Sequence, residues 1–265
     1  MKRKSRDTRR LCLESLEQRE LMAGNVQVTV KQGVLRLVGD DRANAVEVYQ
    51  DASCRSGQFL VVPVASSGPI DTLINGRAGT PQKFSGVTRG IQADMKGGDD
   101  ALLIVGPGAY TASVPGPVGV VVDMGAGDDY FGLSNVKVAG SCTISGQAGN
   151  DRIRVGLSTI KINLVIDAGG GNDDVALNDT KVGGNLTASM GAGDDQLRIY
   201  GTSADSIYTA MGDGNDYFLI RDSSSNALPS FDGGNGKDTL AYYNNKFPRR
   251  FVYAPPYCVN WEKIG

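Results

Sequence analysis

The stretch DMGAGDDYFGL (residues 123–133) occurs in related form seven times between residues 94 and 242. The acidic core of each copy ends in an aspartate, and successive copies are separated by 29, 22, 22, 22, 21 and 22 residues. A period this regular predicts a stack of structural repeats that pack on their neighbours. We number the last acid of each copy as position 0, which gives Asp100, Asp129, Asp151, Asp173, Asp195, Asp216 and Asp238.

Apolar side chains recur at fixed offsets from position 0. Positions +2 and +4 are apolar or aromatic in every copy, as in Phe131 and Leu133. Offsets −9 and −7 hold pairs such as Val120 and Val122, and offset +9 holds residues such as Val138. Alternation by two predicts strands with every second side chain inside. A helical solenoid is excluded because the apolar period is not 3.6 and each unit carries several glycines.

Three short strands in each repeat predict one triangular coil, and coils should stack at the strand spacing of about 4.8 Å. We therefore predict an all-β, single-domain parallel β-helix with capped ends, right-handed as other parallel crossover connections are. The expected divisions are a basic N-terminal segment (1–24), an N-terminal β cap (25–90), the repeats (91–242) and a C-terminal cap (243–265).

Both caps contain recognisable features. GDDRANAVEV (39–48) reads as a degenerate copy of the repeat, with Asn44 at position 0. The C-terminal cap holds three prolines and the single tryptophan of the chain. Since proline blocks further strand pairing, we expect Trp261 and Tyr257 to cover the last coil. An aromatic platform for sugar binding is the alternative interpretation of these two residues.

Composition excludes several classes of function. Histidine is absent, which removes the commonest general base and transition-metal ligand. Residues 21–265 hold 20 Lys and Arg against 25 Asp and Glu, a balance of −5, and this disfavours nucleic acid as a partner. No stretch reaches the roughly 18 apolar residues of a transmembrane segment.

The four cysteines, Cys12, Cys54, Cys142 and Cys258, match no metal-site spacing. Cys142 falls at offset −9, so we expect a reduced core residue. Cys54 and Cys258 fall in opposite caps, which the stack separates by more than about 30 Å. Because a disulfide needs Cα atoms within about 7 Å, we predict no bridge between them.

The acids of the turns form rows. Position 0 is aspartate in all seven copies, position −1 is Asp, Asn or, once, Lys237, and position −6 is often Asp. Unit charges stacked at about 4.8 Å repel by about 3 kcal/mol at an effective dielectric of about 20. Either backbone N–H groups hold these carboxylates or cations lie between the coils. Oxygen-only ligands on flexible turns suit Ca²⁺.

The turn also resembles the calcium-binding repeats-in-toxin motif, G-G-x-G-x-D-x-U-x. Gly125 to Phe131 and Gly191 to Leu197 match its G-x-G-x-D-x-U part. The motif occurs once per coil here, and Lys96 and Gln147 replace the first glycine of two copies. The resemblance implies Ca²⁺ as cofactor, with Asp128/Asp129 and Asp194/Asp195 as the strongest pairs. The candidate metal ligands are Asp99, Asp100, Asp123, Asp128, Asp129, Asp151, Asp167, Asp173, Asp194, Asp195 and Asp216.

The N-terminal stretch RRLCLESLEQRELMAG (9–24) resembles the LEPR-XLL motif of Planctomycetes surface and secreted proteins. Leu16-Glu17-Gln18-Arg19 stands in place of Leu-Glu-Pro-Arg, and Leu21-Met22-Ala23 in place of Leu-Leu-Ala. The resemblance implies an address to the cell envelope or the extracellular space. Composition alone favours a disordered basic tail with one amphipathic turn.

The sequence therefore predicts a non-catalytic, calcium-binding monomer of the cell surface or secreted fraction, acting in surface structure or adhesion. Its partners would be calcium ions and a surface polysaccharide or envelope protein, but not nucleic acid. A lyase-like polysaccharide-active enzyme and a metal-free structural solenoid are the alternatives. The even recurrence of the acids disfavours the enzyme, because a catalytic site should break the symmetry. We expect Arg152, Arg154 and Arg198 to be outward, solvated side chains.

Overall fold

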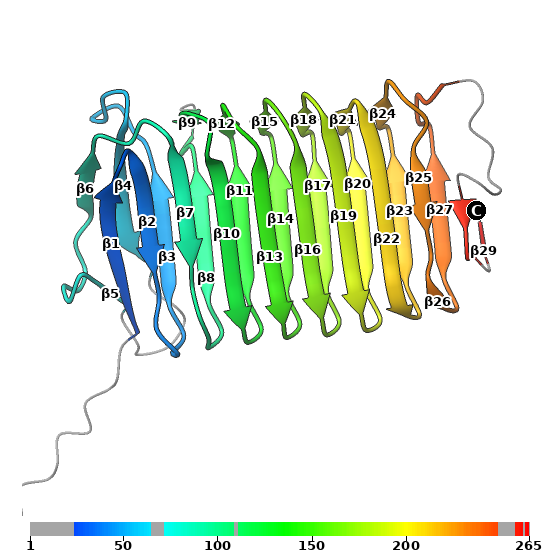
Figure 1. Cartoon of the computed structure of the whole chain (residues 1–265), viewed down its shortest axis with the longest axis horizontal. Helices are drawn as coiled ribbons and strands as arrows, with labels where there is room; N and C mark the ends of the chain where they lie inside the picture. Colours follow the sequence, from blue (N-terminus) through cyan, green and yellow to red (C-terminus); the bar gives the residue numbers. More distant parts are fainter. Residues whose placement is uncertain (1–23, 65–71, 109–110, 249–257, 262, 265) are drawn as a thin grey trace, which may run out of the picture.

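The computed structural model describes residues 24–64, 72–108, 111–248, 258–261 and 263–264. These residues form strands that stack along one long axis, with one coil of chain beside the next (Figure 1). Two sheets run the length of the stack and a third, shorter sheet runs along its middle, and together they form a β-solenoid with coils of about 22 residues. The predicted all-β, parallel solenoid is confirmed. Among the described residues there is no helix long and apolar enough to cross a membrane.

The first sheet takes one strand from each coil. Its parallel strands are β2 (Val34–Val38), β7 (Gly90–Asp94), β10 (Gly119–Ala126), β13 (Cys142–Ala148), β16 (Leu164–Gly170), β19 (Asn185–Ala192), β22 (Ser206–Gly214), β25 (Ser230–Asp232) and β28 (Cys258–Val259). At the N-terminal end, β1 (Asn25–Lys31) pairs antiparallel with β2 and parallel with β5 (Leu73–Ile74). The short β26 (Asn235–Gly236) pairs with β22.

The second sheet follows the turn of each repeat. Its parallel strands are β3 (Ala45–Tyr49), β8 (Ala101–Val105), β11 (Tyr130–Ser134), β14 (Arg152–Gly156), β17 (Asp174–Asn178), β20 (Gln196–Tyr200), β23 (Tyr217–Arg221), β27 (Thr239–Tyr243) and β29 (Lys263–Ile264). Two further strands, β4 (Gln58–Pro63) and β6 (Gln82–Ser85), extend it antiparallel beyond β3.

The third sheet is made of shorter strands. They are β9 (Ala112–Val114), β12 (Val136–Val138), β15 (Thr159–Ile160), β18 (Lys181–Val182), β21 (Ser203–Ala204) and β24 (Ser224–Ser225). With this sheet the six coils from β7 to β24 each have three sides, as the spacing of the apolar residues predicts.

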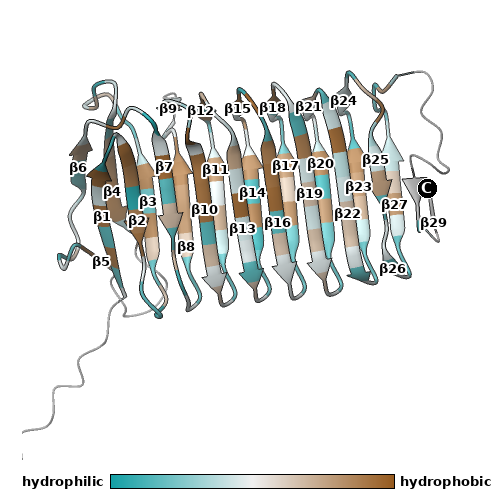
Figure 2. Ribbon diagram, in the orientation of Figure 1, coloured by the Kyte–Doolittle hydropathy of each residue, from teal (hydrophilic) through white to brown (hydrophobic). Residues whose placement is uncertain are grey.

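The core runs through the middle of the stack. The residues predicted to point inward do so: Val120 and Val122 are at most 1% exposed, as are Phe131 and Leu133, and Val138 is 2% exposed. The register of the parallel strands places residues with the same offset side by side in successive coils, so that Ile144 pairs with both Val122 and Ile166. Apolar and polar residues alternate along the strands (Figure 2). This burial of apolar surface is the main term that stabilises the coils.

The N-terminal end contains the degenerate repeat. Residues 39–48 belong to a coil, formed by β2 and β3, that is in register with the next one, because β2 pairs with β7 and β3 pairs with β8. Asn44 is buried at position 0, and its backbone N–H donates to Oδ1 of Asp100 at 2.7 Å. The predicted role of Asn44 is confirmed.

At the C-terminal end, Trp261 packs against the core, its ring centroid 6.1 Å from that of Phe218. Its Nε1 donates to the carbonyl oxygen of Phe231 at 3.2 Å. The predicted covering role of Trp261 is confirmed, whereas Tyr257 lies outside the described residues. Cys54 and Cys142 are free thiols, whereas the side chain of Cys258 lies outside the described residues. Burial raises the pKa of the Cys142 thiol to about 12.

Candidate functional site: two ladders of turn side chains

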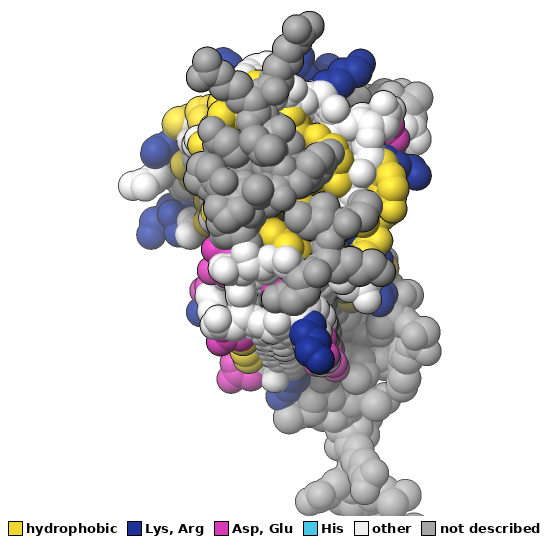
Figure 3. Space-filling view, turned by 90° about the vertical axis from the view of Figure 1, so that its right-hand side faces the viewer, with side chains coloured by type: hydrophobic (Ala, Val, Ile, Leu, Met, Phe, Trp, Pro, Cys, Tyr) yellow, Lys and Arg dark blue, Asp and Glu magenta, His cyan; other side chains and the backbone are white. Residues whose placement is uncertain are grey.

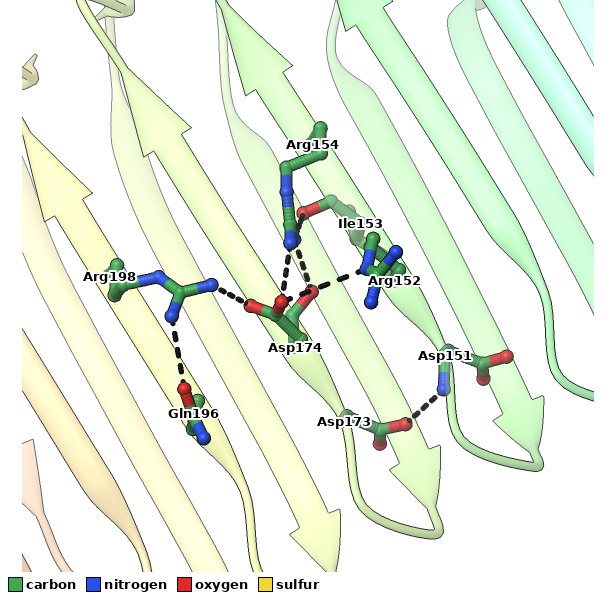
Figure 4. Close-up of polar contacts among 8 residues, drawn as sticks. All are labelled: Asp151, Arg152, Ile153, Arg154, Asp173, Asp174, Gln196 and Arg198. Atoms are coloured by element: carbon green, nitrogen blue, oxygen red, sulfur yellow. Dashed lines mark hydrogen bonds and ion pairs between the residues drawn. The ribbon is translucent and has the colours of Figure 1, made fainter.

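The aspartates at position 0 point inward and join successive coils. In each case Oδ1 accepts the backbone N–H of the position-0 residue one coil earlier. The pairs, donor first, are Asn44 to Asp100 (2.7 Å), Asp100 to Asp129 (2.7 Å), Asp129 to Asp151 (2.9 Å), Asp151 to Asp173 (2.7 Å), Asp173 to Asp195 (2.7 Å), Asp195 to Asp216 (2.8 Å) and Asp216 to Asp238 (2.9 Å). Figure 4 shows one rung, between Asp151 and Asp173. We call this row the inner ladder.

Each carboxyl group of the inner ladder has a second oxygen with a different environment. The side chains are at most 3% exposed. In six of them Oδ2 is buried and has no hydrogen-bond partner: Asp100, Asp129, Asp151, Asp173, Asp195 and Asp216. A buried carboxylate oxygen without a partner strongly disfavours the charged form of the group.

Burial therefore raises the pKa of these carboxyl groups far above that of a free aspartate. The pKa values rise to about 8 at Asp100, about 7 at Asp129 and Asp173, and about 6 at Asp151, Asp195 and Asp216. Desolvation is the largest cause in every case, the hydrogen bond from the backbone opposes it, and neighbouring acidic groups add to it. At neutral pH the inner ladder is thus close to its own titration range.

The residues at position −1 form a second row, the outer ladder, which lies at the exposed side of the turn. Here the direction is reversed, because each side chain accepts the backbone N–H of the next coil. The pairs, donor first, are Asp128 to Asp99 (3.0 Å), Asn150 to Asp128 (2.7 Å), Asn172 to Asn150 (2.8 Å), Asp194 to Asn172 (2.8 Å) and Asn215 to Asp194 (2.8 Å). Asparagine and aspartate are interchangeable in this role because both supply a side-chain oxygen.

The two acids of one turn therefore face opposite sides. Asp128 is exposed whereas Asp129 is buried, and the same holds for Asp194 and Asp195. The pairs named from the sequence do not converge on one point. Across the part of the chain that the structure describes, no group of three or more Asp, Glu, Cys or His side chains is placed to hold a metal ion.

The acids at position −6 lie on the outward face of the first sheet. Asp94 forms an ion pair with Lys96 at 2.5 Å. Oδ2 of Asp123 accepts a long hydrogen bond of 3.4 Å from Gln147, while its Oδ1 is buried without a partner. Asp167 is exposed. Viewed from the C-terminal end of the stack, acidic side chains gather toward the lower part of the molecule, where the turns lie (Figure 3).

The glycines of the turn are required by its backbone. Gly191 has a φ of +107°, and a Cβ there would lie 1.7 Å from the carbonyl oxygen of Gly169 in the preceding coil. Lys96 and Gln147, which replace this glycine in two copies, have φ values of 83° and 79°. They occupy the same place in the turn, as the sequence comparison of the copies predicts, and they do so in a strained conformation.

A further cluster lies on the outward face of the second sheet. Arg154 and Arg198 form ion pairs with the two carboxylate oxygens of Asp174, and Nε of Arg152 is 3.8 Å from Oδ2 (Figure 4). Sequence reasoning placed these arginines correctly on the outside but treated them as separate solvated side chains. The signal that could have found the cluster is the offset from position 0. Arg152 and Asp174 are at +1, and Arg154 and Arg198 are at +3, so all four side chains lie on the same outward face of three successive coils.

No protein-family model, curated protein or solved structure matches this chain. The candidate function therefore depends on the geometry of the ladders and of the outward faces.

Proposed function

We propose that this chain is a non-catalytic β-solenoid of the cell envelope or the extracellular space, which acts in surface structure or adhesion and binds calcium along its turns. The observation that carries the calcium proposal is the inner ladder. Six of its carboxyl groups each have a buried Oδ2 without a hydrogen-bond partner. When these groups ionise, the column of negative charge requires a counter-charge, and Ca²⁺ prefers oxygen ligands of this type.

The donor atoms of the turns fit calcium in kind. They are carboxylate oxygens, the amide oxygens of residues such as Asn172, and backbone carbonyls. Since Asp128 and Asp129 face opposite sides, the residues that would hold an ion belong to successive coils and not to one turn. Asp129, Asp151 and Asp173 of the inner ladder are the first candidates, because each has an unpartnered oxygen.

A metal-free structural solenoid is the second candidate. It is favoured by the hydrogen bonds of the inner ladder and by the raised pKa of its carboxyl groups, which allow protons to neutralise the column. Calcium and protons are therefore competing counter-charges for the same groups. This competition gives an experiment that separates the two candidates.

The experiment is a thermal melt at about pH 5.5 and about pH 8.5, in excess chelator or in calcium at fixed ionic strength. The pH values bracket the raised pKa values of the ladder, such as about 7 at Asp129. Calcium binding to the folded state alone should raise the melting temperature at the higher pH by mass action. It should have little effect at the lower pH, where protons occupy the carboxyl groups. Equal melting temperatures with and without calcium at the higher pH would contradict calcium binding and favour the metal-free structural solenoid.

The envelope or extracellular location is supported by the resemblance of residues 9–24 to the LEPR-XLL motif. An elongated stack with regular coils also suits a spacer or adhesive element. Cell fractionation of the full chain and of a variant lacking residues 1–24 tests the location. The full chain should reach the surface or the medium, and the shortened chain should stay inside the cell. Equal distribution of the two would contradict the address.

The polysaccharide-active enzyme remains the competing class of function. Its test is to assay polysaccharide release and polysaccharide binding in parallel with the same preparation. Binding without release supports the non-catalytic proposal. Release of fragments without an added cofactor would replace the proposal with an enzyme.

A further inference from the structure

The outward face of the second sheet differs in charge from the rest of the molecule. The outward side chains of β11, β14, β17 and β20 include Arg152, Arg154 and Arg198 with one acid, Asp174, a balance of +2. The exposed Asp128 of the neighbouring turn lines the same hollow as Arg152. Residues 21–265 as a whole balance at −5. A positive patch on an acidic body attracts anions to one defined place.

The arginines of this patch are held in position. Arg154 pairs with Oδ2 of Asp174, and one of its terminal nitrogens also donates to the carbonyl oxygen of Asp174 at 2.6 Å and that of Ile153 at 3.1 Å. Arg198 pairs with Oδ1 of Asp174 and donates to Oε1 of Gln196 at 3.0 Å. The guanidinium groups of Arg154 and Arg198 are therefore fixed, so a ligand that contacts these two groups loses little side-chain entropy on binding.

Arg152 is the member of the patch left open to solvent. Its side chain is 62% exposed. The contact of its side chain with Asp174 is long, 3.8 Å from Nε to Oδ2, and no side-chain hydrogen bond of Arg152 is seen among the described residues. The terminal nitrogens of such a guanidinium match the two oxygens of a carboxylate in a bidentate pair.

An apolar hollow lies beside the arginines. Gly132 pairs across the sheet with Arg154, and Tyr130 pairs with Arg152. The Tyr130 ring leans over Gly132, since a Cβ on Gly132 would be 3.5 Å from Cε1 of Tyr130. Tyr130, Gly132, Arg154 and the exposed Leu157 line a hollow of about 320 Å³. Gly132 itself is buried beneath the side chains of Leu103 and Tyr130, so the floor of the hollow is apolar and its edge carries the cation Arg154.

This combination fits a ligand that presents an apolar ring face, hydroxyl groups and a carboxylate together. We propose that the face formed by β11, β14, β17 and β20 binds an acidic polysaccharide, with a uronic acid carboxylate at Arg152 and its ring against Tyr130. The proposal rests on the adhesive part of the proposed function and does not depend on calcium. A nucleic acid strand fits less well, because its closely spaced phosphates would pass the exposed Asp128 and Asp194 of the outer ladder.

Two substitutions test the face in different ways. Arg152→Gln removes the open guanidinium, and Gly132→Val fills the hollow with a side chain that favours strands. The nearest atom to the new Cβ would be Cδ2 of Leu103 at 3.0 Å, the flexible end of a side chain. Lys161→Gln is the control, because Lys161 is an exposed cation that follows β15 on the third sheet.

The measurement is isothermal titration calorimetry of the full chain with hyaluronan oligosaccharides at about pH 6, once in calcium and once in chelator. Circular dichroism in the same buffers verifies that each variant is folded. The wild-type chain should bind hyaluronan but not neutral dextran. Arg152→Gln should weaken binding about tenfold, the effect of one charge-assisted hydrogen bond. Gly132→Val should weaken it to a similar extent, and Lys161→Gln should leave it unchanged.

Three outcomes would overturn the proposal. They are no binding of hyaluronan in either buffer, an equal loss in Lys161→Gln, and binding of poly-dT as tight as that of hyaluronan. Failure here is distinguishable from failure of the calcium proposal. If the polysaccharide proposal fails, a folded chain shows absent or unspecific binding of hyaluronan. If the calcium proposal fails, the melting temperature does not respond to calcium.

Discussion

Oδ1 of Asp129 accepts the backbone N–H of Asp100, one coil earlier in the stack, at 2.7 Å. Oδ2 of the same carboxyl group is buried without a hydrogen-bond partner. One oxygen thus satisfies a buried backbone donor, which would be costly to leave unpaired. The other makes the charged form of the group unfavourable. The inner ladder repeats this combination at six successive aspartates, from Asp100 to Asp216, so that their protonation is linked to the stability of the stack.

This linkage predicts that the protein is more stable in acid than in base. The folded-state pKa values of the inner ladder are raised to between about 6 and about 8, from 3.8 for an unperturbed aspartate. A raised pKa means that the folded state binds more protons than the unfolded state. The stability that this supplies is fully present below the unfolded pKa and is lost as the pH rises through the folded pKa. In chelator, the melting temperature should fall by at least about 5 °C between about pH 5 and about pH 8.5. A melting temperature that rises over this range would contradict the assignment.

Substitution of Asp173 separates its two roles. Asp173→Asn keeps an oxygen that can accept the N–H of Asp151 and removes the charge. Asn44 already occupies the equivalent position in the first coil, where its Nδ2 donates to the carbonyl oxygen of Arg42 at 2.6 Å. We expect Asp173→Asn to raise stability at about pH 8 in chelator by about 1 kcal/mol. Asp173→Ala should lower it by about 1–3 kcal/mol, because the buried N–H of Asp151 loses its acceptor.

Chemical denaturation of the two Asp173 variants at two pH values measures this difference. Asp173→Asn should also reduce the pH dependence of stability relative to the wild-type chain. If the two variants lost equal stability at both pH values, the hydrogen bond and the charge would not be the properties that matter at this position.

The fold was predictable from the sequence for a specific physical reason. Phe131 and Leu133 follow position 0 at +2 and +4, and strands place alternate side chains on opposite faces. A period of two repeated every 22 residues therefore specifies the inward rows directly, and Val120, Val122 and Val138 are all buried as expected. Even the degenerate copy around Asn44 could be found, because its flanking valines and leucines keep the same offsets.

The ladders were only partly predictable. The stacking of acids follows from the period, but the sequence does not state which atom of a carboxyl group meets which backbone donor. Alternation by two implies that Asp128 and Asp129 face opposite sides, so adjacency in the sequence does not make the two carboxylates of one turn converge. The contact of Arg154 and Arg198 with Asp174 depends on the conformations of long side chains, which the offsets do not fix.

A buried hydroxyl group gives an independent prediction about the core. Thr209 occupies offset −7, where the coil of β10 has Val122, and its Oγ1 is buried without a hydrogen-bond partner. Thr209→Val replaces the hydroxyl with a methyl group of similar size. Removing the unsatisfied polar atom should raise the free energy of unfolding by about 1 kcal/mol.

Thr180→Val is the matched control for Thr209→Val. Thr180 is equally buried, but its Oγ1 donates to the carbonyl oxygens of Asn178 at 3.1 Å and Val155 at 3.3 Å. The same chemical change should therefore lower stability at this position by about 1 kcal/mol. Urea denaturation of both variants gives the comparison. Destabilisation by Thr209→Val would show that its hydroxyl group has a partner, for example a water molecule.

The turn glycines supply the last prediction. Gly191→Ala should be strongly destabilising, by about 3 kcal/mol or more, because its φ of +107° disfavours a side chain and its Cβ would meet a carbonyl oxygen at 1.7 Å. The reverse change, Gln147→Gly, should stabilise the protein by about 1 kcal/mol, since Gln147 has a φ of 79°. The hydrogen bond that it loses, to Asp123 at 3.4 Å, is long and exposed.

Gly170→Ala is the control for both glycine variants. A Cβ on Gly170 would meet nothing within 4 Å, and its φ lies outside the left-handed region, so the substitution should change stability by less than about 0.5 kcal/mol. Gly191→Ala, Gln147→Gly and Gly170→Ala differ in the backbone conformation at the substituted residue and in the space around its Cβ. Thermal melts of the three variants in one buffer compare their stabilities directly. Gly170→Ala as damaging as Gly191→Ala would mean that glycine is needed throughout the turn, and not only where the coils touch.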